Sequence, residues 1–467
     1  MSDSAPDPAD TAAALLGRAQ TLRRTIAGSF RDNLVEAIYD DAQAIADRVV
    51  KQPGERHRDW DQRIDRLLTS PTLGLPLMLA MLAVVFWITI IGANYPSQML
   101  AAGLFWIESA AAGAFESWGA PWWLTGFVWH GVYRALAWVV AVMLPPMAIF
   151  FPLFTILEDL GYLPRAAFNL DRLFKKAGAH GKQVLTMSMG FGCNAAGVIA
   201  CRTIDSPRER LIAILTNNFV PCNGRWPTLI LLATVFVAAA APPGLASVVA
   251  AGSIVMVVLV GVLFTLIVSA LLSRTVLKGE PSAFTLELPP YRRPSILRIL
   301  YTSLIDRTIF VLGRAIVCAA PAGAVIWLLA NISVGGQSLA AHASAALDPF
   351  GVALGLNGVI LLAYVIAIPA NEIVVPTILM LYLGATMMTE EPSPEGFREL
   401  LVDQHGWTLL TAVNLMLFSL LHNPCATTIY TMWKETRRLK WTLLGALLPL
   451  AIAFAVTFAV AQAVRLF

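Results

Sequence analysis

Long apolar stretches separated by short polar ones make up most of this chain after residue 70. A stretch of about 20 apolar residues can cross the hydrocarbon core of a bilayer as a helix. Seven stretches meet this length, near residues 73–93, 126–157, 211–240, 246–272, 307–330, 407–432 and 441–464. Because the runs are continuous rather than alternating, they predict an all-α polytopic membrane protein and exclude a β-barrel.

Two further apolar segments, near residues 183–201 and 351–384, are interrupted by polar residues. The interrupting motifs are Met189-Gly-Phe-Gly-Cys193-Asn194 and Ile368-Pro369-Ala-Asn371-Glu372-Ile373. An ionisable group at membrane depth costs at least about 2.5 kcal/mol, so it indicates a function. Glycine and proline leave backbone carbonyls unpaired, and such backbone persists at that depth only inside protein or along a cavity. We therefore expect both segments to be gates.

The distribution of Lys and Arg predicts the orientation of the chain. Basic residues gather in the first 70 residues and in the loops 158–182, 273–300 and 433–440, which we place in the cytoplasm with the N-terminus. The loop 94–125 has no Lys or Arg, so we place it outside. The first gate then enters and leaves from the cytoplasm, and the second from outside. If either segment crosses once instead, the orientation of everything downstream reverses.

The two halves of the chain form an inverted repeat in this interpretation. After its gate, each half has a span with a Pro-Cys step, in Asn218-Phe-Val-Pro221-Cys222-Asn223 and in His422-Asn423-Pro424-Cys425. Paired interrupted segments in two inverted halves mark the substrate site of transporters, near the midplane. The predicted fold is about seven full spans plus two re-entrant gate hairpins.

Four regions follow along the chain. They are a cytoplasmic helical arm (1–70), a first membrane half with the first gate motif (71–275), a cytoplasmic loop (276–300) and a second membrane half with the second gate motif (301–467). Within the first half, the stretch 98–118 is short, carries two Glu and ends near several Trp. We interpret it as an interfacial helix with an aromatic belt.

The composition agrees with a membrane protein and gives no sign of a nucleic-acid partner or a disulfide framework. The chain is 57% hydrophobic and 13% charged, against about 25% charged residues in soluble domains. Its net charge of +3 and its five cysteines, without a CxxC pair, indicate neither a nucleic-acid partner nor a disulfide framework. The expected surroundings are the lipid bilayer.

The two gates together offer ligands for a divalent metal ion. We predict metal ligands at Met189, Cys193, Asn194, Cys222, Asn371, Glu372 and Cys425, further pathway residues at Glu158, Asp159, His422 and Asn423, and gate backbone at Gly190, Gly192, Pro221, Pro369 and Pro424. Thiol and thioether are soft, whereas carboxylate and carbonyl are hard. Such a mixture suits Fe²⁺, Mn²⁺, Co²⁺ or Zn²⁺, and composition alone does not choose among them.

Each candidate has a purely structural alternative. The cysteines can be small apolar packing residues, and the prolines can simply kink helices. Glu372 can be one partner of an ion pair with Arg225, and His422 a histidine satisfied within the core. The adjoining Glu158 and Asp159 can mark only the end of a helix.

These motifs resemble a known family. Residues 30–467 resemble the membrane permease part of ferrous iron transport protein B, of the Feo family. The resemblance is carried by the stretches Leu157–Phe168, Met189–Asn194, Arg202-Thr203, Asp205–Arg210, Asn218–Cys222, Asp306-Arg307, Asp348–Gly351, Gly358–Leu362, Ile368–Ile373 and Leu421–Cys425. It implies two inverted gates, a route for Fe²⁺ through a bacterial inner membrane into the cytoplasm with Cys193 and Cys425 on it, and no permanently bound cofactor.

The sequence departs from the family in two places. Members carry an N-terminal GTP-binding domain, but these 467 residues contain no GxxxxGK[ST] phosphate loop, so we expect a transporter without GTPase activity of its own. Either a separate GTPase subunit or a small accessory Feo-type protein docks on it, or transport runs without nucleotide. Ala195-Ala196 also replaces the Val-Pro frequent after the first gate motif. The oligomeric state is left open.

Two other functions remain open at this point. The gate motif is shared with families associated with nucleoside recognition, so an organic solute is an alternative, with Phe191 and Tyr364 as the obvious stacking partners. The second alternative is a membrane subunit of a larger complex that transports nothing itself.

Overall fold

The computed structural model describes Arg18 and residues 30–49, 58–70, 72–242, 244–279, 291, 294–388 and 394–466. Nearly all of this part is helical, and its two strands, β1 (Ser333–Val334) and β2 (Gln337–Ser338), form one short antiparallel hairpin. Within the described residues, seven helical stretches are long and apolar enough to cross a membrane, namely Gly74–Ser117, Trp122–Asp159, Pro207–Ala240, Ala246–Arg274, Val311–Asn331, Leu409–Thr436 and Leu439–Leu466. The predicted all-α membrane fold with about seven spans is confirmed.

The arm and the first half contribute the following elements. They are α2 (Phe30–Val49), α3 (Arg58–Leu68), α4 (Gly74–Ser117), α5 (Trp122–Thr125), η1 (Gly126–Tyr133), α6 (Arg134–Asp159), α7 (Tyr162–Lys176), α8 (Gln183–Gly192), α9 (Asn194–Ala200), η2 (Cys201–Thr203), α10 (Pro207–Thr216), η3 (Asn217–Phe219), η4 (Asn223–Arg225), α11 (Trp226–Leu232), η5 (Ala233–Val237), η6 (Ala238–Ala240) and α12 (Ala246–Arg274).

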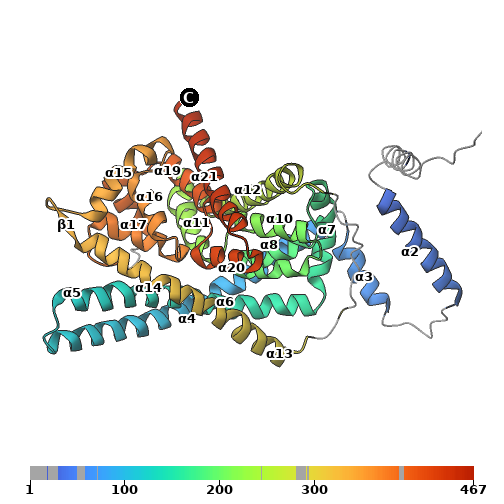
Figure 1. The fold of residues 1–467 in the computed structure, drawn as a ribbon, viewed down its shortest axis with the longest axis horizontal. Helices are drawn as coiled ribbons and strands as arrows, with labels where there is room; N and C mark the ends of the chain where they lie inside the picture. Colours follow the sequence, from blue (N-terminus) through green and yellow to red (C-terminus); the bar gives the residue numbers. More distant parts are fainter. Residues whose placement is uncertain are drawn as a thin grey trace, which may run out of the picture.

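The second half contains the remaining elements (Figure 1). They are α13 (Ile296–Tyr301), η7 (Thr302–Ile309), α14 (Phe310–Asn331), the β1–β2 hairpin, α15 (Leu339–Ala353), α16 (Gly358–Ile366), η8 (Asn371–Ile373), α17 (Val374–Leu383), α18 (Pro394–Arg398), η9 (Glu399–Gln404), α19 (Leu409–Leu421), α20 (Ala426–Thr436) and α21 (Leu439–Leu466).

The first span is longer than the sequence pattern predicts. Helix α4 has 44 residues, about 66 Å at 1.5 Å per residue, and the separate interfacial helix expected at 98–118 is wrong. The charge that suggested an interface is Glu108, which is buried against the returning helix. His130 Nδ1 lies 2.6 Å from its carboxylate, and Arg134 Nη1 lies 3.1 Å from it. Because Glu108 finds buried partners in these groups, the helix continues, and α4 and α6 form a long hairpin (Figure 1).

Both gate segments are broken in their middle, as predicted. Helix α8 ends at Gly192, and Cys193 is extended at φ −151°, ψ 122° before α9 begins. In the second half Ala370 has φ −151°, ψ 119° directly before η8. The two breaks therefore have the same backbone geometry one residue before an asparagine, Asn194 or Asn371. Helix α8 packs against α9 and α16 against α17, while α15 and α16 meet at a further bend of 112°.

The two Pro-Cys steps interrupt spans rather than merely bending them. Between η3 and η4 the chain is extended at Val220 and at Cys222. Between α19 and α20 it is extended at His422 and at Cys425. Four interruptions, two from each half, are thus available to form one site. The membrane side from which each gate enters stays a prediction.

The arm reaches the membrane part through α3. Arg165 of α7 donates from Nε to Asp65 Oδ1 at 2.8 Å, and the Tyr291 hydroxyl donates to the same oxygen at 2.7 Å. Burial alone would raise the pKa of Asp65, but these two hydrogen bonds outweigh it, and the pKa lies below its ordinary value. Helix α2 lies apart from the membrane part (Figure 1). Most of residues 1–29 and 280–293 lie outside the described residues, and the four-region division stays a prediction.

Candidate functional site

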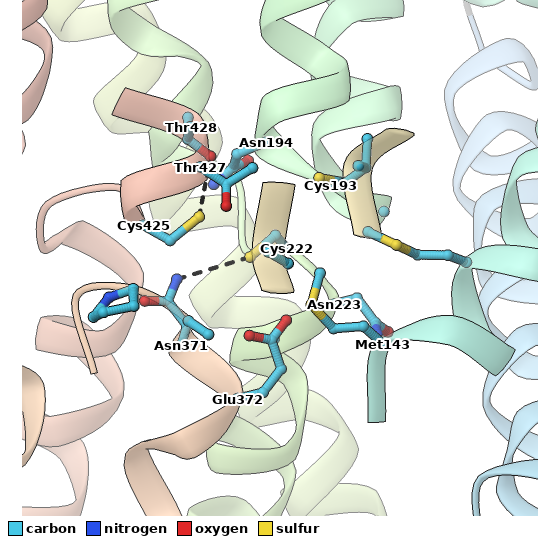
Figure 2. Close-up of a pocket in the computed structure, with 17 residues that line it drawn as sticks. Met143, Cys193, Asn194, Cys222, Asn223, Asn371, Glu372, Cys425, Thr427 and Thr428 are labelled. Atoms are coloured by element: carbon cyan, nitrogen blue, oxygen red, sulfur yellow. Dashed lines mark hydrogen bonds between the residues drawn. The ribbon is translucent and has the colours of Figure 1, made fainter. Parts of the chain in front are cut away.

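One cavity lies where the four interruptions meet (Figure 2). It leaves about 30 Å³ for the centres of water-sized occupants, which is room for very few waters or for one partly dehydrated ion. Its walls include three thiols, one carboxylate, three carboxamides and two hydroxyls. These side chains belong to Cys193, Cys222, Cys425, Glu372, Asn194, Asn223, Asn371, Thr427 and Thr428.

The breaks in the helices explain why these side chains gather. Cys193, Cys222 and Cys425 are each the extended residue that directly precedes a new helical segment. An extended residue between two helical arms leaves the regular helix surface, so its side chain can enter the gap between the arms. Asn371 and Glu372 open η8 after the extended Ala370 in the same way.

Glu372 lies against the backbone of the first half. A Cβ added to Gly224 would lie 2.4 Å from Glu372 Oε1, so this approach requires glycine. The alternative of an ion pair between Glu372 and Arg225 is wrong, since the two do not pair in the described structure. The carboxylate instead faces the cavity (Figure 2).

Arg225 joins the two halves behind the cavity. Its Nη1 donates to the carbonyl oxygens of Asn218 and Leu420, both at 2.8 Å. Its Nη2 donates to Asn218 Oδ1 at 3.1 Å and to the carbonyl oxygen of His422 at 3.2 Å. The buried guanidinium thus binds carbonyls that the end of α19 leaves unpaired. It acts as a cross-link between the two Pro-Cys steps.

His422 lies behind the cavity and orients one of its walls. Its Nδ1 lies 2.8 Å from the carbonyl oxygen of Ser419, so Nδ1 carries a proton and donates. Its Nε2 lies 3.3 Å from the side-chain amide of Asn371. Asn371 Oδ1 faces His422, and Asn371 Nδ2 faces Cys222. His422 contacts the cavity only through Asn371.

The other predicted residues lie in different places. Of the gate backbone, Gly192 and Pro369 line the cavity, whereas Gly190, Pro221 and Pro424 do not. Met189 packs at the edge of the hydrophobic core, and Glu158 and Asp159 are exposed at the end of α6, away from the cavity. Asn423 donates to the carbonyl oxygen of Pro424 at 3.3 Å. These residues do not line this cavity, and their roles as ligand, pathway or gate-backbone residues stay predictions.

Sequence reasoning missed two methionines of α6. Met143 and Met147 line the cavity and lie one helical turn apart, on either side of Pro145 and Pro146. Thr427 and Thr428, directly after the Pro-Cys step, were missed as well. A proline pair inside an apolar run, flanked by thioethers, is the signal that points to α6.

The cavity residues do not form a closed metal site in this arrangement. Among the described residues, no three His, Cys, Asp or Glu side chains are near enough to one another to hold a metal ion. Asn371 Nδ2 and Cys222 Sγ are 4.0 Å apart, and Cys425 Sγ lies 3.3 Å from Thr428 Oγ1. The donors surround a common space without converging on one point.

Gly192 offers a test of how tightly the first gate is packed. A Cβ at this position would lie 2.2 Å from Phe150 Cε1, well inside contact distance. We expect Gly192→Ala to displace the Phe150 ring or the break at Cys193 and to lower the unfolding temperature in detergent by several degrees. Gly252→Ala on α12 is the matched control, because nothing lies within 4 Å of its added Cβ. Equal unfolding temperatures for the two variants would show that the first gate can accommodate a methyl group at this position.

Comparison with known proteins identifies two family models in this chain. The model described as Gate, nucleoside recognition, matches residues 140–236 and 312–438, which include all four interruptions. The model described as ferrous iron transport protein B C terminus matches residues 254–306. No solved structure matches the chain.

Several bacterial proteins are similar over most of the chain. The Fe(2+) transporter FeoB of Staphylococcus aureus (strain MSSA476) is 28% identical over 94% of this chain and 63% of its own length. The FeoB of Synechocystis sp. is 28% identical over 91% of this chain and 68% of its own length. The FeoB of Legionella pneumophila is 31% identical over 57% of this chain. The chain spans about 63% of the length of the S. aureus relative.

Proposed function

Since the chain belongs to the FeoB family as a homologue of its membrane region, we propose that it is a permease for a divalent transition-metal ion, with Fe²⁺ as the substrate. The observation that carries the proposal is the cavity at which the two halves meet. It combines three thiols with the Glu372 carboxylate at the level where both gates break. The family relation favours Fe²⁺ over Mn²⁺, Zn²⁺ and Co²⁺, which the same donor types also bind.

The donor set matches what a transported ion needs. Thiolate and carboxylate charges offset the double charge of the ion, and carboxamide and hydroxyl oxygens replace part of its water shell. The Thr427 hydroxyl is buried and has no hydrogen-bond partner in the described structure, so its oxygen is available as a ligand. Met143 and Met147 add thioethers on the α6 side.

The open arrangement of the donors suits transport better than storage. A transport site must bind the ion well enough to remove water and weakly enough to release it. We propose that the two gate segments approach each other around the ion and separate again, which changes how many of the donors reach it. Cys193, Cys222, Cys425 and Glu372 are the proposed ligands, with Asn371 and Thr427 in support.

The nucleoside alternative fits the cavity less well. The cavity leaves only about 30 Å³ for the centres of water-sized occupants, which is room for very few waters rather than for a base and a sugar. The candidate stacking residues are also engaged within the protein, since Phe191 stacks on Trp226 and Tyr364 meets His422 edge-on. The non-transporting subunit is disfavoured because such a subunit has no use for polar gates that are costly to bury.

The setting proposed for this permease is the cytoplasmic membrane of a bacterium, with the N-terminus in the cytoplasm. An inside-negative potential then assists a dication inward by about 4.6 kcal/mol per 100 mV, twice the value for one charge. A separate GTPase subunit or a small accessory Feo-type protein is the proposed partner of the cytoplasmic loops.

Reconstitution of the 467-residue chain in liposomes tests the proposal. Under anaerobic, reducing conditions with an imposed inside-negative potential and no nucleotide, we expect uptake of radiolabelled Fe²⁺ above that of empty liposomes. A second arm adds candidate GTPase partners with GTP. Uptake that appears only in this arm would show that transport needs a partner. No uptake by folded protein in either arm would contradict the proposal.

The substitution Cys193→Ser tests whether Cys193 binds the ion or only packs against its neighbours. Serine has nearly the shape of cysteine but offers a hard oxygen in place of a soft sulfur. We expect the substitution to reduce uptake of Fe²⁺ more than uptake of the harder Mn²⁺, measured as a ratio in the same liposomes. Cys318→Ser, on α14 and outside the cavity, is the matched control. An unchanged ratio in Cys193→Ser would mean that Cys193 only packs.

A further inference from the structure

A second, larger cavity lies between the first gate and the lipid-facing surface. It leaves about 100 Å³ for the centres of water-sized occupants, and its walls come from α4, α6, α7, α8 and α12. Only Tyr162 and Ser188 contribute hydroxyls, and Ser188 Oγ already donates to the carbonyl oxygen of Val184 at 2.9 Å. Apolar cavities of this kind do not hold water, and leaving them empty is costly. The lining therefore indicates a hydrocarbon occupant.

The cavity is continuous with the surface that faces the bilayer. Two of its walls, α4 and α12, are spans that are mostly not covered by the rest of the protein. Only 19% of the most apolar stretch of α4 and 28% of that of α12 is buried. Leu79 of α4 and Leu259 of α12 line the cavity and are 43% and 48% exposed. The opening between them leads sideways into lipid, so a lipid chain can enter without crossing water.

Basic residues stand at one end of two walls of the cavity, α7 and α12. Helices α7 and α12 meet at their C-terminal ends, where Ser273 Oγ donates to the carbonyl oxygen of Ala177 at 3.4 Å. Lys176 ends α7 and Arg274 ends α12, and both are exposed. This charge complements the phosphate of a phospholipid whose acyl chain extends from the headgroup level toward the cavity.

We propose that this cavity binds one acyl chain of a bilayer phospholipid, with the lipid phosphate near Lys176 and Arg274. The floor of the cavity is α8, the first arm of the first gate. Phe191 lines this cavity on one side, and on the other it lines a small cavity shared with Gly192 and Asn223, next to the candidate ion site. The acyl chain would thus pack against α8 on the side away from the candidate ion site. The binding itself is independent of any transported ion.

Native mass spectrometry of the detergent-purified chain, incubated with phosphatidylglycerol, tests the proposal without metal. We expect the wild type to retain one tightly bound phospholipid per chain. Leu259→Trp closes the mouth and should abolish this retention. Val255→Trp, one turn away on the exposed face of α12 and outside the cavity, is the control that should retain the lipid.

A second variant tests the same point if Leu259→Trp does not fold. Ala166→Phe fills the cavity from α7 and should also remove the bound lipid. Replacing Lys176 and Arg274 together by Gln should weaken retention while leaving the cavity intact. The proposal is overturned if the wild type retains no lipid, if a folded Leu259→Trp or Ala166→Phe retains it, or if Val255→Trp loses it as well.

Discussion

Glu372→Gln is expected to reduce Fe²⁺ uptake at least about tenfold, the effect of roughly 1.4 kcal/mol in the binding or barrier free energy. Glutamine keeps the volume of the side chain and its place against Gly224, but it removes the one carboxylate in the cavity wall. Without that charge, fewer negative groups offset a dication that has lost part of its water. Initial uptake rates in liposomes of equal protein content measure the effect.

The control for this prediction is Glu116→Gln on α4. Glu116 is exposed and remote from the cavity, so its neutralisation should leave uptake unchanged. Protein yield and elution in size-exclusion chromatography should match the wild type for both variants. Unchanged uptake in Glu372→Gln would remove this residue from the ion's route, and equal losses in both variants would point to a general charge effect instead.

Arg225→Gln is expected to destabilise the protein by about 3 kcal/mol or more. The substitution removes a buried cation whose hydrogen bonds reach both Pro-Cys steps, and hydrogen bonds to charged groups contribute about 1.5–3 kcal/mol each. It also removes the side-chain donor to the carbonyl of Leu420, whereas the carbonyl of His422 keeps its hydrogen bond from Asn218 Nδ2. Thermal unfolding in detergent, followed by the loss of monodisperse protein, measures the effect.

Two further variants make this prediction specific. Arg225→Lys keeps the charge but not the planar fork that reaches several carbonyls at once, so it should recover only part of the stability. Arg314→Gln, which removes a half-buried arginine with a 3.2 Å hydrogen bond to Thr431, should cost much less. If Arg225→Gln and Arg314→Gln unfolded at the same temperature, Arg225 would not be the cross-link that we infer.

The apolar pattern predicted the spans well because crossing a bilayer depends on local length and hydropathy. It failed at 98–118, where Glu108 and the nearby tryptophans suggested an interface. Two residues of the returning helix, His130 and Arg134, bind the carboxylate of Glu108, and α4 continues. A local pattern contains no information about partners that arrive from another helix.

The interruptions of the gates were also readable from the sequence, because glycine, proline and polar residues are costly inside an apolar helix. Their chemistry indicated which side chains had a use: the three thiols, the carboxylate and the carboxamides of Asn194 and Asn371 do line one cavity. Met189 belongs to the first gate motif, yet it packs against the hydrophobic core and does not line the cavity. Met143 and Met147 face the cavity instead, although no motif contains them.

The order of residues is enough to show that this chain spans a membrane, where its helices break, and which donor groups stand at the breaks. These properties depend on neighbouring residues and on the cost of burying polar groups in hydrocarbon. The packing of the helices was needed to show that Arg225 binds backbone carbonyls rather than Glu372, and that α6 completes the cavity. Both depend on how helices distant in the sequence pack together, and many packings satisfy the same local hydropathy.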